Sequence, residues 1–202
     1  MKQKILIMML CIPGIPFLLN AQKISYELFA GISSACYSAN SKGSELSDFK
    51  TGFTGGFAVN FKTGKHWAIQ PGLSYVQKGG VEKDFSYGTK YYTTLNYLEL
   101  PINMTYSKRN RFVLGFGLFA AYGLSGKIKA DGGVNDEVKI TFGNGTNDLK
   151  PFDAGINLLV GYHSPNRMSI SINIASSGNN ISNDDQYYFS NAYIGIRAGY
   201  LF

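Results

Sequence analysis

Apolar and polar residues alternate with a period of two along most of the chain. Such alternation is typical of β-strands with two different faces, because successive side chains of a strand point to opposite sides. The clearest stretch is 98–106, where Leu, Ile, Met and Tyr take the even positions and Glu, Pro, Asn and Thr the odd ones. The pattern predicts eight strands and no helix, over residues 24–37, 51–62, 67–78, 93–106, 111–126, 150–163, 168–176 and 191–202.

The connections between the predicted strands alternate between long and short. Turn-forming segments of four residues stand at 63–66, 107–110 and 164–167, and long polar segments at 38–50, 79–92, 127–149 and 177–190. An even number of antiparallel strands, with short turns at one end and long loops at the other, is the arrangement of an outer-membrane β-barrel. Both ends of the chain then lie on the side of the short turns, which is the periplasmic side.

A soluble up-and-down barrel of the lipocalin kind shares this layout, so the distribution of charge decides between the two. A solvated outer face would carry Lys and Glu. Only 16% of the residues are charged, against the ~25% of an ordinary soluble domain, and most of them fall in the connections. The strand face opposite the apolar one is mostly Gly, Ser, Ala, Asn and Thr, which suits a narrow interior. The pattern therefore favours an all-β, eight-stranded antiparallel transmembrane barrel.

Aromatic residues make up 14% of the chain and gather towards the two ends of the apolar face. Membrane barrels carry such belts where their outer surface crosses the interfaces between lipid and water. We expect one belt near the short turns, formed by Tyr26, Phe61, Trp67, Tyr106, Phe112, Tyr162 and Tyr200. We expect the other near the long loops, formed by Phe53, Tyr75, Tyr97, Tyr122 and Phe152.

The first residues predict a targeting segment. Lys2 and Lys4 precede an uncharged and mostly apolar stretch at 5–19, which is shorter than a membrane helix and is interrupted by Pro and Gly. We therefore expect a cleaved signal peptide at 1–21 and one outer-membrane β-barrel domain at 22–202. The protein would reach the periplasm through the general secretory (Sec) pathway.

The cysteines and the net charge exclude further classes. Cys11 lacks the small preceding residue of a lipid-attached cysteine, which leaves lipid attachment as the lesser alternative. Cys36 would remain alone after cleavage, so it predicts a small buried side chain and no disulfide. The net charge of +6 is spread thinly, so we expect no nucleic-acid partner. His66 and His163 stand in separate turns without metal-ligand spacing, and we expect neither a metal nor a cofactor.

Several charged and amide side chains stand at positions that face the interior of the predicted barrel. An eight-stranded barrel is about wide enough to be filled by its side chains. We therefore expect a structural network of ion pairs and hydrogen bonds, with a polar channel or proton path as the alternative. Pairing of the last strand with the first would place Arg197 near the height of Glu27. The predicted inward set is Glu27, Gln70, Lys78, Glu99, Arg111, Asn157, Asn173 and Arg197.

His163 and Ser164 invite comparison with the serine–histidine pairs of outer-membrane lipid A deacylases. Nucleophilic catalysis needs the base within hydrogen-bond reach of the hydroxyl. Neighbours on a strand point to opposite sides, so we expect these two side chains to diverge. Both also stand at the periplasmic end, away from the outer leaflet. The sequence thus favours a protein that is not an enzyme.

The loops and two prolines complete the expectations. The connection at 127–149 is rich in Gly and acidic residues but lacks the spacing of a calcium loop, which predicts a flexible surface loop. The connection at 177–190 is of the same kind. Pro71 and Pro101 each remove a ladder donor from a predicted strand, and we expect a bulge at each.

Two segments resemble the PorT-like outer-membrane β-barrel family. Residues 67–79, WAIQPGLSYVQKG, are similar to the family's QPE-L-Y-QKG strand, and residues 95–101, LNYLELP, to its NYLEIP strand. Gly72 departs from the pattern, because the family usually has Glu there, so one interior acid is missing. The terminal Phe202 resembles the C-terminal signal by which barrels are handed to the insertion machinery. The resemblance implies an outer-membrane location in a Gram-negative bacterium.

The sequence therefore predicts a non-catalytic outer-membrane barrel with a structural or surface-interaction role through its long extracellular loops. The expected partners are outer-membrane lipid, the barrel insertion machinery through Phe202, and a protein at the extracellular loops or periplasmic turns. The resemblance implies one alternative, an accessory component of an outer-membrane secretion or assembly system. A lipid A-modifying enzyme is the weaker alternative.

Overall fold

The computed structural model describes residues 24–40, 46–84, 88–109, 111–131, 137–184 and 187–202. The described residues form nine strands: β1 (Ile24–Asn40), β2 (Lys50–Lys62), β3 (Trp67–Lys83), β4 (Lys90–Lys108), β5 (Phe112–Ala130), β6 (Glu137–Ile140), β7 (Phe152–His163), β8 (Met168–Ser177) and β9 (Tyr188–Leu201). No helix long and apolar enough to cross a membrane occurs in this part of the chain. The predicted signal peptide at 1–21 lies outside the described residues.

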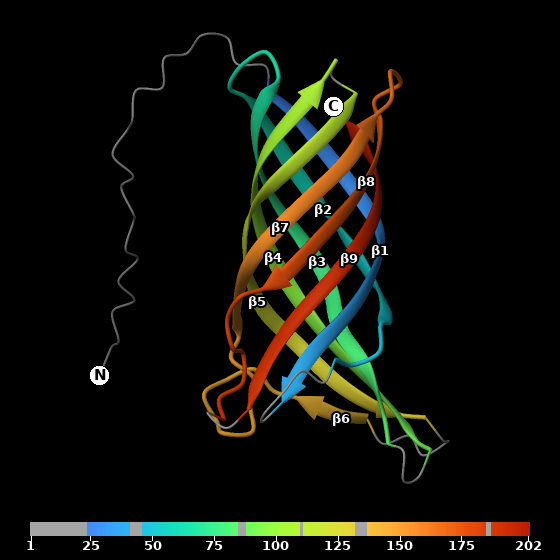
Figure 1. The fold of residues 1–202 in the computed structure, drawn as a ribbon, viewed down its shortest axis with the longest axis vertical. Helices are drawn as coiled ribbons and strands as arrows, with labels where there is room; N and C mark the ends of the chain where they lie inside the picture. Colours follow the sequence, from blue (N-terminus) through green and yellow to red (C-terminus); the bar gives the residue numbers. More distant parts are fainter. Residues whose placement is uncertain (1–23, 41–45, 85–87, 110, 132–136, 185–186) are drawn as a thin grey trace, which may run out of the picture.

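Eight of these strands close into a barrel (Figure 1). Strands β1 to β5 follow one another as antiparallel neighbours, then come β7, β8 and β9, and β9 returns to pair with β1. That seam runs from Glu27 opposite Leu201 to Asn40 opposite Tyr188. The predicted eight-stranded, antiparallel up-and-down barrel is therefore confirmed. Closure leaves no open sheet edge within the barrel.

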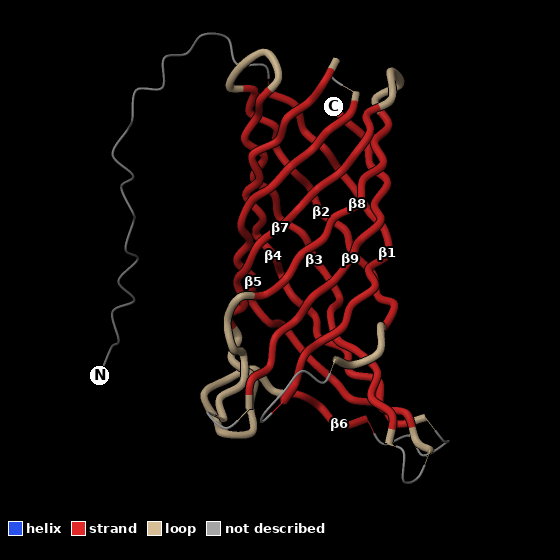
Figure 2. The backbone as a smooth tube through the Cα atoms, in the orientation of Figure 1, coloured by secondary structure: helices blue, strands red, loops and turns tan. Residues whose placement is uncertain are grey.

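The two ends of the barrel differ, as Figure 2 shows. The tight turns after β2, β4 and β7 lie together with the C terminus at the top of the picture, and the longer connections lie at the other end. We call these the short-turn end and the loop end. At the loop end the strands run further than predicted, since β3 continues to Lys83 and β4 starts at Lys90. The sequence pattern also missed β6, which pairs with the far end of β5. At the loop end both faces of a strand meet water, so apolar and polar residues no longer alternate along its sequence.

The outward face is apolar over the height of the barrel. Phe112, Leu118 and Ile156 are 65%, 68% and 60% exposed. Contiguous apolar exposure of this extent is a liability in water and the required surface in lipid. The aromatic belt at the short-turn end contains Trp67, which packs edge-on against Tyr106 with ring centroids 5.1 Å apart.

Two details of the strand predictions are wrong. Tyr97 does not belong to the outward belt: it is fully buried inside the barrel, because its odd position matches that of Glu99. Neither Pro71 nor Pro101 forms a bulge, since the strand register is the same on both sides of each proline. The register shift lies instead at Asn96 and Tyr97, opposite Leu124, which is an extra residue of β5.

The lone cysteine has the environment expected from the sequence. Cys36 of β1 is buried and makes no disulfide. It pairs in the ladder with Ala192 of β9, next to the fully buried Ala35. The prediction of a small buried side chain is confirmed.

Candidate functional site

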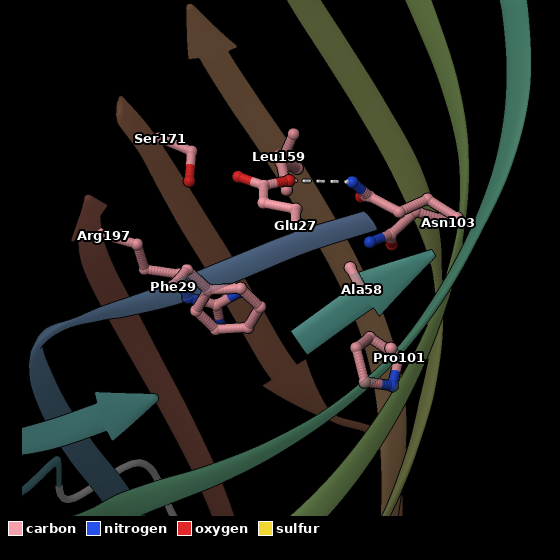
Figure 3. Close-up of a pocket in the computed structure, with 10 residues that line it drawn as sticks. Glu27, Phe29, Ala58, Pro101, Asn103, Leu159, Ser171 and Arg197 are labelled. Carbon is pink, nitrogen blue, oxygen red and sulfur yellow. Dashed lines mark hydrogen bonds between the residues drawn. The ribbon is translucent and has the colours of Figure 1, made fainter. Parts of the chain in front are cut away.

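The barrel interior is filled by the side chains of its inward positions. Figure 3 shows a cavity inside the stem, in the half nearer the short-turn end. Its volume is about 20 Å³, room for roughly one water molecule. The lining residues are Glu27, Phe29, Ala58, Gln70, Gly72, Pro101, Asn103, Leu159, Ser171 and Arg197. The stem is therefore too narrow at this height for a hydrated ion.

Lys78 of β3 points into the barrel and is 2% exposed. Its Nζ lies 3.1 Å from Oε2 of Glu99 on β4 and 3.0 Å from Oδ2 of Asp153 on β7, and both carboxylates are fully buried. Three rings surround the ammonium, with centroids at 5.0, 4.4 and 5.4 Å: Tyr97, Phe119 and Tyr193. Ion pairs and ring faces together offset the cost of removing this charge from water. We call Lys78, Glu99 and Asp153 the interior triad.

Tyr193 of β9 links the interior triad to a second cation. Its hydroxyl donates to Oε1 of Glu99 at 2.6 Å and accepts from Nδ2 of Asn173 at 3.0 Å. It also accepts from Nη2 of Arg197 at 3.2 Å, and the Arg197 guanidinium lies 4.7 Å from the ring centroid of Phe29. Two cations and two carboxylates thus meet in one network across the barrel, with no formal net charge. Such a balance lowers the cost of burying each member.

Glu27 belongs to a separate group nearer the short-turn end. Its Oε1 accepts from Ser169 Oγ at 2.6 Å. Its Oε2 accepts from Gln70 Nε2 at 3.4 Å, the bond drawn as a dashed line in Figure 3. The seam sets Arg197 opposite Gly31, four residues along β1 from Glu27, so the two charges are not directly paired. They do line the same cavity. Gly72 lines it as well, at the position where the PorT-like pattern has an acid.

The structure brings together most of the residues predicted to face inward. Glu27, Gln70, Lys78, Glu99, Asn157, Asn173 and Arg197 are all buried in the interior. Arg111 is the exception: it is exposed in the turn before β5, which begins one residue later. Asp153 and Tyr193 are members that the predicted set lacked. The alternation along each strand could have identified them. Tyr193 and Arg197, for example, both have odd numbers in β9 and therefore face the same side of the strand.

A second cavity, of about 240 Å³, opens at the short-turn end. Both His163 and Ser164 line it. Strand β7 ends at His163, and Ser164 already belongs to the turn, so the expected divergence of two neighbours on a strand stays a prediction. In the described chain no hydrogen bond joins the two side chains, and Ser164 Oγ accepts from the backbone N–H of Asn166 at 3.4 Å. The described residues also contain no group of three His, Cys, Asp or Glu that could hold a metal ion.

The loop end is tied together by asparagine side chains. Nδ2 of Asn183 donates to the carbonyls of Gly143, Gly145 and Asp148, at 2.8, 3.1 and 3.1 Å. Oδ1 of Asn180 accepts from the backbone N–H groups of Ser182 and Phe189. In the described residues 141–149, these bonds tie the connection predicted to be a flexible surface loop to the connection after β8; its flexibility stays a prediction. We call residues 141–151 and 178–184 the loop platform.

Beside the loop platform, β6 extends the end of β5 outside the barrel. Lys127 of β5 and Glu137 of β6 form an exposed ion pair at 2.9 Å. Lys127 lowers the pKa of Glu137 below its ordinary value, first through this hydrogen bond and then through its charge. A groove of about 600 Å³ runs along this pairing, and residues lining it include Tyr122, Leu124, Lys139 and Phe142.

Comparison with known proteins gives a family model and several solved structures. The model described as outer membrane protein beta-barrel domain matches residues 20–181. The attachment invasion locus protein Ail of Yersinia pestis is similar in fold. One Ail structure has 12% identity and a TM-score of 0.50, with 89% of this chain and 99% of that chain covered. Neisserial surface protein A has 8% identity and a TM-score of 0.49, with coverages of 87% and 96%. Among curated proteins, no sequence matches the chain.

Proposed function

Since the chain belongs to the outer membrane protein beta-barrel domain family, we propose that it is a non-conducting surface-interaction protein of the Gram-negative outer membrane. The barrel lies in that membrane, with its short turns in the periplasm and its loops outside. The observation that carries the proposal is the contrast between its two parts. The stem is filled by an internally paired network, whereas at the loop end the described residues 141–151 and 178–184 are joined to one another by hydrogen bonds. A surface on a rigid scaffold is where binding sites are commonly found.

Strand β6 is the best candidate for the contact with a partner protein. In the described chain it pairs with β5 alone, so its outer edge presents backbone donors and acceptors. Val138, at its centre, is 60% exposed. Unpaired edges of this kind are recognised by extended segments of other proteins, which add a strand to the sheet. The groove next to β6 supplies room for side chains of such a segment.

Site-specific photocrosslinking in intact cells tests the proposal. A benzophenone amino acid at Val138 should give a discrete protein adduct, and the same probe at Ile156, on the lipid-facing surface, should give none. Heat-modifiable migration on a gel verifies that both variants form the folded barrel. An absence of adducts at Val138 in the native cell envelope would contradict the surface-interaction role.

The accessory role in secretion is the second candidate. It is supported by the two segments that resemble the PorT-like family, because 67–79 and 95–101 are hydrogen-bonded neighbours in β3 and β4. Deleting the gene and comparing the secreted proteins tests it, and unchanged secretion would remove it. The weaker enzymatic alternative predicts that His163→Ala alters the lipid A mass profile, so an unchanged profile would count against it.

A further inference from the structure

Charge is distributed unequally between the two ends of the barrel. The three short turns and the strand ends next to them carry Lys65, Lys108, Arg109, Arg111 and Arg167, and these turns contain no Asp or Glu. The described residues of the extracellular end mix both signs, as in the pairs Lys83–Asp48 and Lys127–Glu137. A rim formed by such basic turns attracts an anionic ligand.

A groove is built into this rim between the turn after β2 and the end of β4. Its volume is about 470 Å³, and it is lined by Lys65, His66, Tyr106, Lys108 and Arg109. Lys65, Lys108 and Arg109 are exposed, which leaves their charged groups accessible. We call this the inner-rim groove. It combines three cations and an imidazole with one aromatic wall.

Hydrogen bonds between the two segments hold the inner-rim groove in shape. The N–H of Ser107 donates to the carbonyl of His66 at 2.7 Å, and Nδ1 of His66 lies 3.2 Å from the carbonyl oxygen of Ser107. The His66 and Tyr106 rings are in contact, with centroids 5.6 Å apart, and Tyr106 packs against Trp67. The walls of the groove are therefore fixed before a ligand arrives.

The position of the groove indicates which anion it meets. Tyr106 and Trp67 belong to the aromatic belt, which lies at the level of the lipid headgroups. Directly towards the membrane centre, Ile69 and Met104 are 40% and 46% exposed on the outward face. A ligand with a negative head and an apolar tail matches both the cations and this surface. Each basic residue near such a surface contributes about 1 kcal/mol of attraction to anionic lipid.

We propose that the inner-rim groove binds the phosphate of an anionic phospholipid in the periplasmic leaflet of the outer membrane. Lys65, Lys108 and Arg109 contact the phosphate, and the acyl chains lie on the apolar face below Trp67 and Tyr106. The inference concerns the opposite end of the barrel from the proposed partner surface, so each can fail without the other.

Native mass spectrometry of the purified full chain in detergent tests this site. Phosphatidylglycerol should be retained in preference to phosphatidylcholine. The double variant Lys65→Gln, Lys108→Gln should bind phosphatidylglycerol about fivefold more weakly for each cation removed. The matched control, Lys129→Gln with Lys139→Gln at the extracellular end, should bind like the wild type. Heat-modifiable migration shows that all three proteins are folded.

Three outcomes would overturn the proposal. Equal retention of the two lipids would show that the groove does not select negative charge. An equal loss in the control variant would show a general effect of net charge. Displacement of phosphatidylglycerol by inorganic phosphate at the same concentration would show a site for the free ion, in which the acyl chains take no part.

Discussion

The ammonium of Lys78 lies 3.1 Å from the carboxylate of Glu99, and both side chains are sealed inside the barrel. Asp153 approaches the same ammonium from the opposite wall at 3.0 Å. One cation from β3 thus joins β4 to β7, strands that are not neighbours in the sheet. The interior triad fixes the cross-section of the stem in addition to the backbone ladders.

Removing the cation of the interior triad should be severely destabilising. Lys78→Met leaves two buried carboxylates without the ammonium that pairs with both of them, which costs about 3–5 kcal/mol. Urea unfolding of the detergent-refolded barrel measures the loss. As a control, Lys83→Met breaks the exposed pair with Asp48, which is worth less than about 1 kcal/mol. The triple variant with Glu99→Gln and Asp153→Asn should recover much of the stability, and a triple variant no better than Lys78→Met alone would contradict this account.

The hydroxyl of Tyr193 should matter more than an equivalent hydroxyl near the surface. Tyr193→Phe leaves the carboxylate of Glu99 and the donors of Asn173 and Arg197 without this shared partner. The expected cost is about 1–3 kcal/mol, the range for leaving buried polar groups unsatisfied. Tyr75→Phe is the matched control, since Tyr75 donates one half-buried bond to Asn96. Equal unfolding midpoints for the two variants would rule out the proposed role of Tyr193.

The filled stem should not conduct ions. The cavity beside Glu27 and Arg197 holds about 20 Å³, and an eight-stranded barrel is only wide enough for its own side chains. Purified protein inserted into a planar lipid bilayer should therefore give no current steps at either polarity. A general porin, added to the same bilayer, provides the positive control. Reproducible steps from the wild-type barrel would show that the interior opens.

Loss of Asn183 should loosen the loop platform and leave the barrel intact. Asn183→Ala removes three hydrogen bonds to the carbonyls of Gly143, Gly145 and Asp148. Each such bond contributes about 1 kcal/mol, so protease cleavage within 141–149 should accelerate by at least tenfold. Asn166→Ala, in a turn at the short-turn end, should not change the cleavage rate. Heat-modifiable migration should remain normal in both variants, and unaltered cleavage of Asn183→Ala would contradict the prediction.

The contact between β5 and β6 should depend on pH. The pKa of Glu137 is lowered by the hydrogen bond and charge of Lys127, with a smaller contribution from Lys129. The carboxylate therefore stabilises the pairing above its ordinary pKa of about 4.3, and this contribution is lost as the pH falls through the lowered value. A carbon-13 NMR titration of the Glu137 carboxyl should show the low pKa, and Lys127→Gln should raise it. An unchanged pKa in Lys127→Gln would contradict the assignment.

The strands of the stem could be predicted because the membrane imposes two different environments on their two faces. Leu98 and Glu99 alternate for that reason, and so do Phe152 and Asp153. The same argument could not predict β6, since its Val138 and Lys139 are both surrounded by water. Arg111 was misplaced for a smaller reason, because β5 begins one residue later than predicted and Arg111 lies in the exposed turn before it.

The partners across the interior are harder to predict than the inward positions. The alternation of inward and outward positions along each strand is enough to place Lys78, Glu99 and Asp153 inside the barrel. Which of these side chains contact one another depends on how far neighbouring strands are shifted along their axes. That shift is set by the closure of the barrel and cannot be read from the alternation in the sequence. For the same reason the approach of Lys78 to Tyr193, from β9, emerges only from the closed structure.

The surplus residue of β5 has a consequence for how this barrel can change in evolution. Before Leu124 in the chain, the inward residues of β5 have odd numbers, as Ala121 does. After Leu124 they have even numbers, as Gly126 does. Deleting Leu124 would restore regular pairing between β4 and β5 and leave every other side chain of β5 on its present face. A deletion elsewhere in the membrane-spanning part of β5 would exchange the lipid-facing and inward residues up to the next turn. The bulge is thus the position at which β5 can gain or lose one residue while the lipid-facing and inward faces of the stem keep their side chains.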